Sequence, residues 1–195
     1  MRPIALILLP LVLFSAGCDS RQLAGNDVAP AAAPEQAGPT KGVDRSHKGK
    51  AAPDVSFRDP DGGEISMADF RGVPVLMNLW ATWCAPCVKE LPTLNDLSKS
   101  HAIDGEIGII AVSQDMAPQN SVRAFLQRLK IDDLGAYQDP DSALSTRLGA
   151  QVLPTTILFD AEGREVWRYV GDLDWTGEEA ARLLAEAGKP ASAPR

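Results

Sequence analysis

The most informative part of the sequence is Trp83-Cys84-Ala85-Pro86-Cys87. It follows an apolar run, residues 73–80, and precedes a helical pattern that extends to Ser100. A thiolate is the reactive form of cysteine, and a helix N-terminus stabilises it with unpaired N–H groups and the positive end of the helix dipole. The order strand, C-x-x-C, helix is therefore typical of a redox-active thiol pair. We expect Cys84 to be exposed just ahead of the helix, and Cys87 to lie in its first turn, close enough to form a disulfide.

The composition is that of a globular protein with one domain and extra segments. The chain has 195 residues, of which 45% are hydrophobic and 23% charged, and this length allows a sizeable core. The net charge is −7 and no basic run occurs, which argues against nucleic acid as a partner. The three cysteines are an odd number, so the third needs its own explanation.

The N-terminus has the pattern of a secretory signal. Arg2 is followed by an apolar stretch, residues 4–14, and by the small residues 15–17. About 11 apolar residues are too few to span a bilayer, which needs about 20. The segment resembles a bacterial lipobox ending at Cys18, although Ser15 stands where leucine is usual. Lipidation of Cys18 would leave one clean cysteine pair; the alternative is an ordinary signal peptide with an incidental cysteine.

Composition also predicts the domain boundaries. We expect a signal peptide over residues 1–17, a lipidated, flexible tether over 18–50, a folded domain over 51–190 and a disordered tail over 191–195. The tether is rich in Ala, Pro, Gly and Gln and shows no hydrophobic period, so it cannot bury enough surface to become ordered. About 30 flexible residues reach roughly 30 Å.

Within the domain, the pattern predicts alternating strands and helices. A hairpin is expected around the turn at 59–63, with Ser66 capping the short turn that follows. The expected strands are 53–57, 64–66, 73–80, 107–112, 135–137, 155–159 and 164–170. The expected helices are 85–100, 121–130, 141–148 and 176–187.

The chain resembles the thioredoxin-fold family, and within it the membrane-anchored TlpA/ResA type. The resemblance covers roughly residues 52–188, and its most specific parts are residues 78–92 and 152–156. It implies an α/β fold with a mixed central sheet and helices on both faces. It also implies an N-terminal β-hairpin and an inserted strand–helix element between about 114 and 150.

The chemistry expected of the pair is thiol–disulfide exchange. Cys84 would attack a substrate disulfide, and Cys87 would resolve the mixed disulfide. A structural zinc site needs four ligands and no second C-x-x-C is present; a structural disulfide is the other alternative. Ala85 and Pro86 add no charge between the cysteines, and Pro86 lacks an N–H. We infer moderate thiolate stabilisation at Cys84 and hence a reducing role.

Glu90 lies three residues after Cys87, so both can face the same side of the helix. In the ResA type the matching glutamate tunes the titration of the cysteines. The alternative is an ordinary solvated helix acid. Asn78 stands where thioredoxin has a buried aspartate that relays protons. An amide cannot take that proton at neutral pH, so the role is vacant or Glu90 fills it.

Pro154 is the expected cis-proline beside the cysteines, because its place before a strand matches the family's cis-proline loop. The Leu153 backbone would then pair with an extended substrate segment. Trp83, together with Ala85 and Pro86, is expected to form the substrate-contact surface. Packing is the alternative role for Trp83.

Together these features predict an enzyme, a thiol–disulfide oxidoreductase whose only redox group is the Cys84–Cys87 pair, with no metal or other cofactor. It would be lipid-anchored on the periplasmic side of the inner membrane. The resemblance implies apocytochrome c or copper-site assembly proteins as substrates, and a membrane thiol reductant of the DsbD/CcdA type as electron donor. The first rival is a copper chaperone, although such carriers use C-x-x-x-C and a distant histidine. A thiol peroxidase is weaker, because Ala81 stands where it needs threonine.

Overall fold

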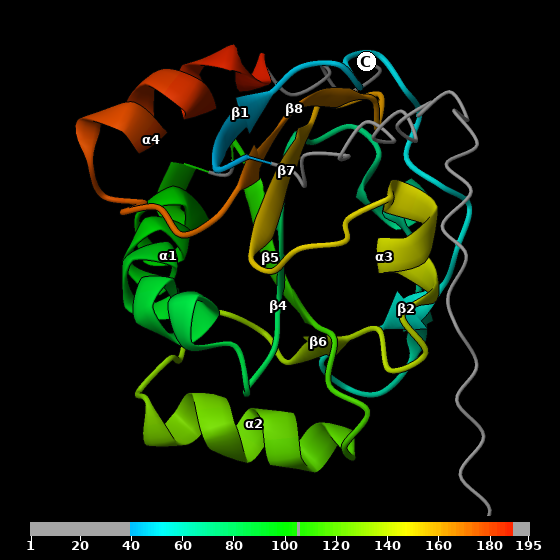
Figure 1. Ribbon diagram of the computed structural model, residues 1–195, viewed down its shortest axis with the longest axis vertical. Helices are drawn as coiled ribbons and strands as arrows, with labels where there is room; N and C mark the ends of the chain where they lie inside the picture. Colours follow the sequence, from blue (N-terminus) through cyan, green and yellow to red (C-terminus); the bar gives the residue numbers. More distant parts are fainter. Residues whose placement is uncertain (1–39, 105, 189–195) are drawn as a thin grey trace, which may run out of the picture. The chain divides into compact units, whose positions relative to one another are not determined.

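The computed structural model describes residues 40–104 and 106–188. Within these ranges the strands form a single mixed sheet in the order β1-β8-β7-β4-β5-β6-β2-β3 (Figure 1). At its centre β4 runs parallel to β5 and antiparallel to β7, which in turn is antiparallel to β8. The bounds of these four strands are Val75–Trp80 (β4), Gly108–Ser113 (β5), Thr155–Phe159 (β7) and Glu165–Val170 (β8).

The central strand β4 is covered on both faces. All six of its residues are buried, and all except Asn78 have largely apolar side chains, as expected for an inner strand of such a sheet. Because side chains alternate along a strand, Leu76 and Trp80 belong to one core cluster, and Val75, Met77 and Leu79 to another. Asn78 therefore faces the same side as Leu76 and Trp80.

Two helical layers cover the sheet. Helices α1 (Ala85–Asp104), α2 (Gln119–Arg128) and α4 (Glu178–Leu184) pack on the side of Trp80. Helix α3 (Ala143–Leu148) and the 3-10 turn η1 (Met67–Phe70) cover the opposite side. Figure 1 shows α1 and α3 on opposite sides of the strands. The predicted α/β fold with a mixed sheet and helices on both faces is confirmed.

The smaller elements also agree with the sequence. The hairpin consists of β2 (Phe57–Arg58) and β3 (Glu64–Ile65). The first strand therefore shares only Phe57 with the predicted 53–57 and continues to Arg58. Ser66 caps η1 as expected, in a capping box with Asp69. The inserted element is β6 (Tyr137–Gln138) followed by α3. The last helix continues into the 3-10 turn η2 (Ala185–Ala187).

The predicted start of the folded domain at residue 51 is wrong. Strand β1 (Gly42–Asp44) pairs antiparallel with Arg168–Val170 of β8, and the Gly49 N–H donates to the Glu165 carbonyl. Edge pairing uses backbone groups and needs no hydrophobic period, so composition could not reveal it; it also covers an edge that would otherwise be open.

The signal peptide (1–17), the lipidation site Cys18 and the tail (191–195) lie outside the described residues. In the ranges that are described, no helix combines the length and the apolar character needed to cross a membrane.

A buried ion pair holds β8 to the end of α3. The Glu165 carboxylate accepts hydrogen bonds from Nε and Nη2 of Arg168, both at 2.7 Å, and Arg168 Nη1 donates to the Leu148 carbonyl. Residues three apart on a regular strand point to opposite faces. Here Phe159 pairs with Glu165 while Leu158 pairs with Trp167, so a β-bulge brings the two charged side chains to one face.

We expect Glu165→Gln to lower the free energy of unfolding by about 3–5 kcal/mol, because it leaves the buried Arg168 charge uncompensated. Glu186→Gln, which breaks the more exposed pair with Arg45, is the control and should cost less than about 1 kcal/mol. Urea unfolding measures both. Equal losses in the two variants would show that the buried pair has no special role.

Candidate active site

The cysteine pair lies where β4 passes into α1. The Cys84 N–H donates to the Ala81 carbonyl, and the Cys84 carbonyl accepts from the Val88 N–H. Cys84 therefore occupies the N-cap position of α1, one residue before its first helical residue, Ala85. At this position a side-chain acceptor normally binds an N–H of the first turn. Here the Cys84 sulfur does so, accepting the Cys87 N–H at 3.3 Å.

The two sulfur atoms are joined in a disulfide, with an Sγ–Sγ distance of 2.08 Å. The prediction that Cys87 lies in the first turn, within bonding distance, is confirmed. The prediction that Cys84 is exposed is wrong, because only 7% of its surface is accessible. Cys87 is fully buried. The sulfurs turn inward because both residues belong to the core cluster under α1, whereas Ala85 and Pro86 between them are exposed.

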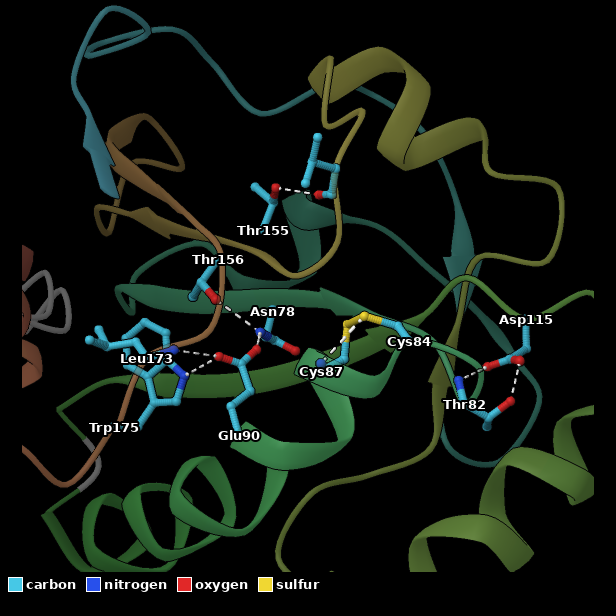
Figure 2. Close-up of a disulfide and its surroundings, with 11 residues drawn as sticks. Asn78, Thr82, Cys84, Cys87, Glu90, Asp115, Thr155, Thr156, Leu173 and Trp175 are labelled. Carbon is cyan, nitrogen blue, oxygen red and sulfur yellow. Dashed lines mark hydrogen bonds between the residues drawn. A yellow bond between two sulfur atoms is a disulfide. The ribbon is translucent and has the colours of Figure 1, made fainter. Parts of the chain in front are cut away.

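Glu90 lies one turn along α1 from Cys87 and is only 3% exposed, so it is not an ordinary solvated helix acid. Its Oε1 accepts from Asn78 Nδ2 at 2.7 Å, and its Oε2 accepts from the Leu173 N–H at 3.0 Å and from Trp175 Nε1 at 3.2 Å (Figure 2). Burial raises the pKa of Glu90 to about 7, and these three donors limit the rise.

A small pocket leads from the surface to Glu90. Its volume is about 220 Å³, and it is lined by Lys89, Glu90, Thr93 and residues 172–174. At its mouth Asp172 pairs with Lys41 at 2.6 Å and with Lys89 at 3.2 Å. The buried carboxyl thus lies against a pocket with charged groups at its rim.

Asn78 occupies the centre of this side of the site. It is directly opposite Thr156 in the β4–β7 pairing, and its Nδ2 donates to Thr156 Oγ1 at 2.9 Å as well as to Glu90. Its amide therefore connects the strands to the glutamate.

A second carboxylate fixes the loop on the other side of the disulfide. Asp115, which is 5% exposed, accepts from Thr82 N at 2.9 Å, Thr82 Oγ1 at 2.6 Å and Ser113 Oγ at 2.7 Å. This holds the residues just ahead of Cys84 to the end of β5 (Figure 2).

The Leu153–Pro154 peptide bond is cis, as predicted. It immediately precedes β7, whose first residue is opposite Leu79 of β4, so the loop lies at the same end of the sheet as the cysteines. The Pro154 carbonyl accepts from the Gly171 N–H. Across the described ranges, the Leu153 backbone has no hydrogen-bond partner in the chain.

Exposed apolar side chains surround this end of the sheet. Trp83 is 71% exposed, in contrast to the fully buried Trp80. Met116 is 88% exposed and Val152 37%. Trp83 and Met116 follow the neighbouring parallel strands β4 and β5 by three residues each, and Val152 precedes β7. An exposed apolar surface of this kind is typical of a protein-binding site.

The sequence did not reveal three contributors to the site. Trp175 and Leu173 hold Glu90, and Asp115 holds Thr82, from positions 85, 83 and 33 residues away. The only sign of the contact with Glu90 in the sequence was the tryptophan Trp175, which follows the acidic residues Asp172 and Asp174. Within the described residues, no group of three His, Cys, Asp or Glu side chains forms a metal site.

The comparison with protein families identifies the domain. The model of the Redoxin family matches residues 47–184. The chain belongs to the Redoxin family. A ResA thiol-disulfide oxidoreductase from Geobacillus kaustophilus is 35% identical over 142 residues, which are 73% of this chain and 78% of that protein. A DsbE thiol:disulfide interchange protein from Pseudomonas fluorescens is 34% identical, with 65% of this chain and 70% of that protein covered.

A solved structure agrees with this membership. A protein from Chlorobium tepidum described as a DsbE-type thiol:disulfide interchange protein has a TM-score of 0.62 and 25% identity. The match covers 72% of this chain and 98% of that one. This redoxin is therefore a thiol–disulfide oxidoreductase of the ResA/DsbE type with a thioredoxin-like fold, and its redox-active group is the Cys84–Cys87 disulfide.

The raised pKa of Glu90 predicts a pH effect on stability. Between pH 4.5, the ordinary pKa of a glutamate, and about 7, the folded protein binds a proton that the unfolded chain has lost. Folding stability therefore falls as the pH rises through this window. We expect Glu90→Gln to remove that part of the pH dependence, measured by urea unfolding from pH 4 to 8, while the surface variant Glu64→Gln keeps it. The same slope in Glu90→Gln and the native protein would contradict the assignment.

Proposed function

We propose that this redoxin reduces disulfides in client proteins outside the cytoplasm, and that it is held at the membrane by a lipid on Cys18. The environment of the Cys84 sulfur is the observation that supports electron flow from this protein to its clients. It occupies the N-cap of α1 and accepts the Cys87 N–H, but the residues between the cysteines carry no charge and Pro86 contributes no donor. A strong oxidant needs a highly stabilised thiolate, since that stabilises its reduced form.

Reduction of a client proceeds in two exchanges. The Cys84 thiolate attacks one sulfur of the client disulfide, whose S–S bond breaks and releases a first client thiolate. The Cys87 thiolate then attacks Cys84 Sγ, the mixed disulfide breaks, and a second client thiolate leaves. The client gains two electrons, the Cys84–Cys87 pair loses two, and solvent protonates the client thiolates. A membrane thiol reductant of the DsbD/CcdA type returns the electrons.

Glu90 holds the proton that Cys87 loses before the second exchange. It is one helical turn from Cys87, it is buried, and its pKa of about 7 suits it to gain and lose a proton near neutral pH. The pocket lined by Lys89 and Asp172 then lets this proton pass to solvent.

The client segment lies on the apolar surface around the disulfide. Trp83, Met116 and Val152 supply exposed contact area, and Ala85 and Pro86 form the exposed rim between the cysteines. The backbone of Leu153 is available to pair with an extended client segment. Clients of this type include apocytochrome c and copper-site assembly proteins, whose thiols must be free before haem or copper is attached in an oxidising compartment.

The reduction potential tests the direction. We expect a value below about −180 mV, the potential of protein disulfide isomerase, because the Cys84 thiolate has one N–H donor and no charged neighbour between the cysteines. Equilibration with glutathione or dithiothreitol buffers gives the value. Pro86→His, which places an ionisable donor there, should raise the potential. A native potential near about −120 mV, that of the strong oxidant DsbA, would contradict the reducing role.

Trapping identifies the clients. In Cys87→Ser the second exchange cannot occur, so the variant should accumulate as a mixed disulfide between Cys84 and a client when it is expressed in its host. Mass spectrometry names the species, and the Cys84→Ser/Cys87→Ser double variant is the control. Recovery of proteins that bind haem or copper through cysteine supports the proposal. Exclusive recovery of a membrane oxidase that donates disulfides would show that electrons flow from the clients to this protein, and would contradict the reducing role.

A further inference from the structure

The carbonyl oxygen of Asn78 is a buried acceptor without a donor. Within the described part of the chain, four buried side-chain polar atoms have no partner: Asn78 Oδ1, Trp80 Nε1, Gln114 Oε1 and Gln138 Oε1. Asn78 is fully buried, and it alone among these residues is bonded to a titratable carboxyl, that of Glu90. An unsatisfied buried acceptor is unfavourable, so its retention next to the redox site requires an explanation.

The position of the Asn78 amide supplies one. Its side chain faces the layer of α1, and its Nδ2 is 2.7 Å from Glu90 Oε1. Figure 2 shows the amide between the Glu90 carboxyl and Cys87, with its oxygen directed toward Cys87. In the disulfide the Cys87 sulfur carries no hydrogen and has nothing to donate. In the reduced protein its thiol is a hydrogen-bond donor.

We propose that the Asn78 amide couples Cys87 to Glu90 by adopting two orientations, a role that rests on the proposed function of Glu90 as the group that holds the Cys87 proton. In the first, the Cys87 thiol donates to Oδ1 while Nδ2 donates to the Glu90 carboxylate. In the second the amide is turned by 180°: Nδ2 donates to the Cys87 thiolate, and the protonated Glu90 donates to Oδ1. One proton is on Cys87 in the first state and on Glu90 in the second, and the pair carries one negative charge in both.

The neighbours of the amide suit both orientations. Thr156 Oγ1 accepts from Nδ2 at 2.9 Å in the structure, and a hydroxyl can equally donate to Oδ1 after the turn. The donors from Leu173 and Trp175 both bind Oε2 of Glu90. They remain in place in either state, so Oε1 is the oxygen that gains and loses the proton.

The fixed charges around Glu90 do not titrate with it. The pKa of Asp172 is lowered by its hydrogen bonds from Lys41 and Lys89, and the pKa of Asp174 by those from Thr176. The pKa of Lys41 is raised by Asp172. Burial raises the pKa of Tyr169 on the adjacent strand β8. A pH-dependent change near neutrality in this part of the site therefore belongs to Glu90 and to the two cysteines, and Glu90→Gln separates the contribution of the carboxyl. The charged and titratable groups that face Glu90 are Lys41, Lys89, Tyr169, Asp172 and Asp174.

The two exchanges can be timed separately with the disulfide probe 5,5′-dithiobis(2-nitrobenzoate). The reduced full-length Cys18→Ser protein, which keeps only the Cys84–Cys87 pair, releases one thionitrobenzoate when Cys84 attacks and a second when Cys87 closes the disulfide. We expect Asn78→Leu to slow the second phase by about tenfold, the factor for a lost hydrogen bond to a charged group, and to leave the first within about twofold. Asn95→Leu is the control: this amide is also buried on α1's side of the sheet, and both its ends bond to Asp133.

The outcomes separate this inference from the proposed function. Slowing of the second phase in both Glu90→Gln and Asn78→Leu supports it. Slowing in Glu90→Gln alone overturns the coupling and keeps the role of Glu90, whereas no change in either overturns both. Equal slowing of both phases in Asn78→Leu would make the amide merely structural. If Asn78→Leu does not fold, Thr156→Val replaces it and should close the disulfide more slowly than Thr156→Ser; equal rates overturn the inference.

A second measurement reads the amide directly. In the reduced protein, the Cys87–Glu90 pair should lose its first proton near neutrality and so form the singly charged state that the amide bridges. The side-chain 15N and 1H resonances of Asn78 should therefore shift with pH in this range, and Glu90→Gln should abolish the shift. The resonances of Asn95 should stay constant. A pH-independent Asn78 amide in the reduced protein overturns the inference.

Discussion

The junction between β4 and α1 is the constraint on which the site depends. A fully buried strand ends at Trp80, and the helix that follows must begin within a few residues, so Cys84 takes the N-cap position. Its sulfur then accepts the N–H of Cys87, in the way that a serine or aspartate oxygen caps other helices. The same geometry brings the two sulfurs within bonding distance and gives the nucleophile the positive end of the helix dipole. Reactivity thus follows from a capping interaction.

Two opposing effects set the pKa of Glu90, and burial is the larger. Burial under α1 favours the neutral acid, whereas donors from Asn78, Leu173 and Trp175 favour the carboxylate. Burial outweighs the donors, so the pKa rises from 4.5 to about 7. A group with a pKa near neutrality can both hold and release a proton. The donors come from β4 and from the segment between β8 and α4, so the tuning of one carboxyl requires the sheet and the last helix to be assembled.

Local patterns were sufficient to predict much of this molecule. The strand predicted at 73–80 and the helix after the cysteines each depend on neighbouring residues, whereas the cis-proline before β7 was implied by the family resemblance. The sequence also pointed to Glu90, through its spacing from Cys87. The contacts that define its chemistry were not predictable, because Trp175 is 85 residues away and its position depends on how α4 packs. β1 was missed since an edge strand pairs through its backbone, and the Glu165–Arg168 pair was missed because it requires a bulge.

The central claim is that the Cys84 sulfur, at the N-cap of α1, is the ionised and accessible nucleophile. Iodoacetamide labelling of the reduced protein across pH, with mass spectrometry to locate the label, tests it most directly. The account predicts rapid labelling of Cys84 with an apparent pKa below about 8.5, the value of a free cysteine, while Cys87 stays protected. Slow labelling of both cysteines at equal rates would contradict it.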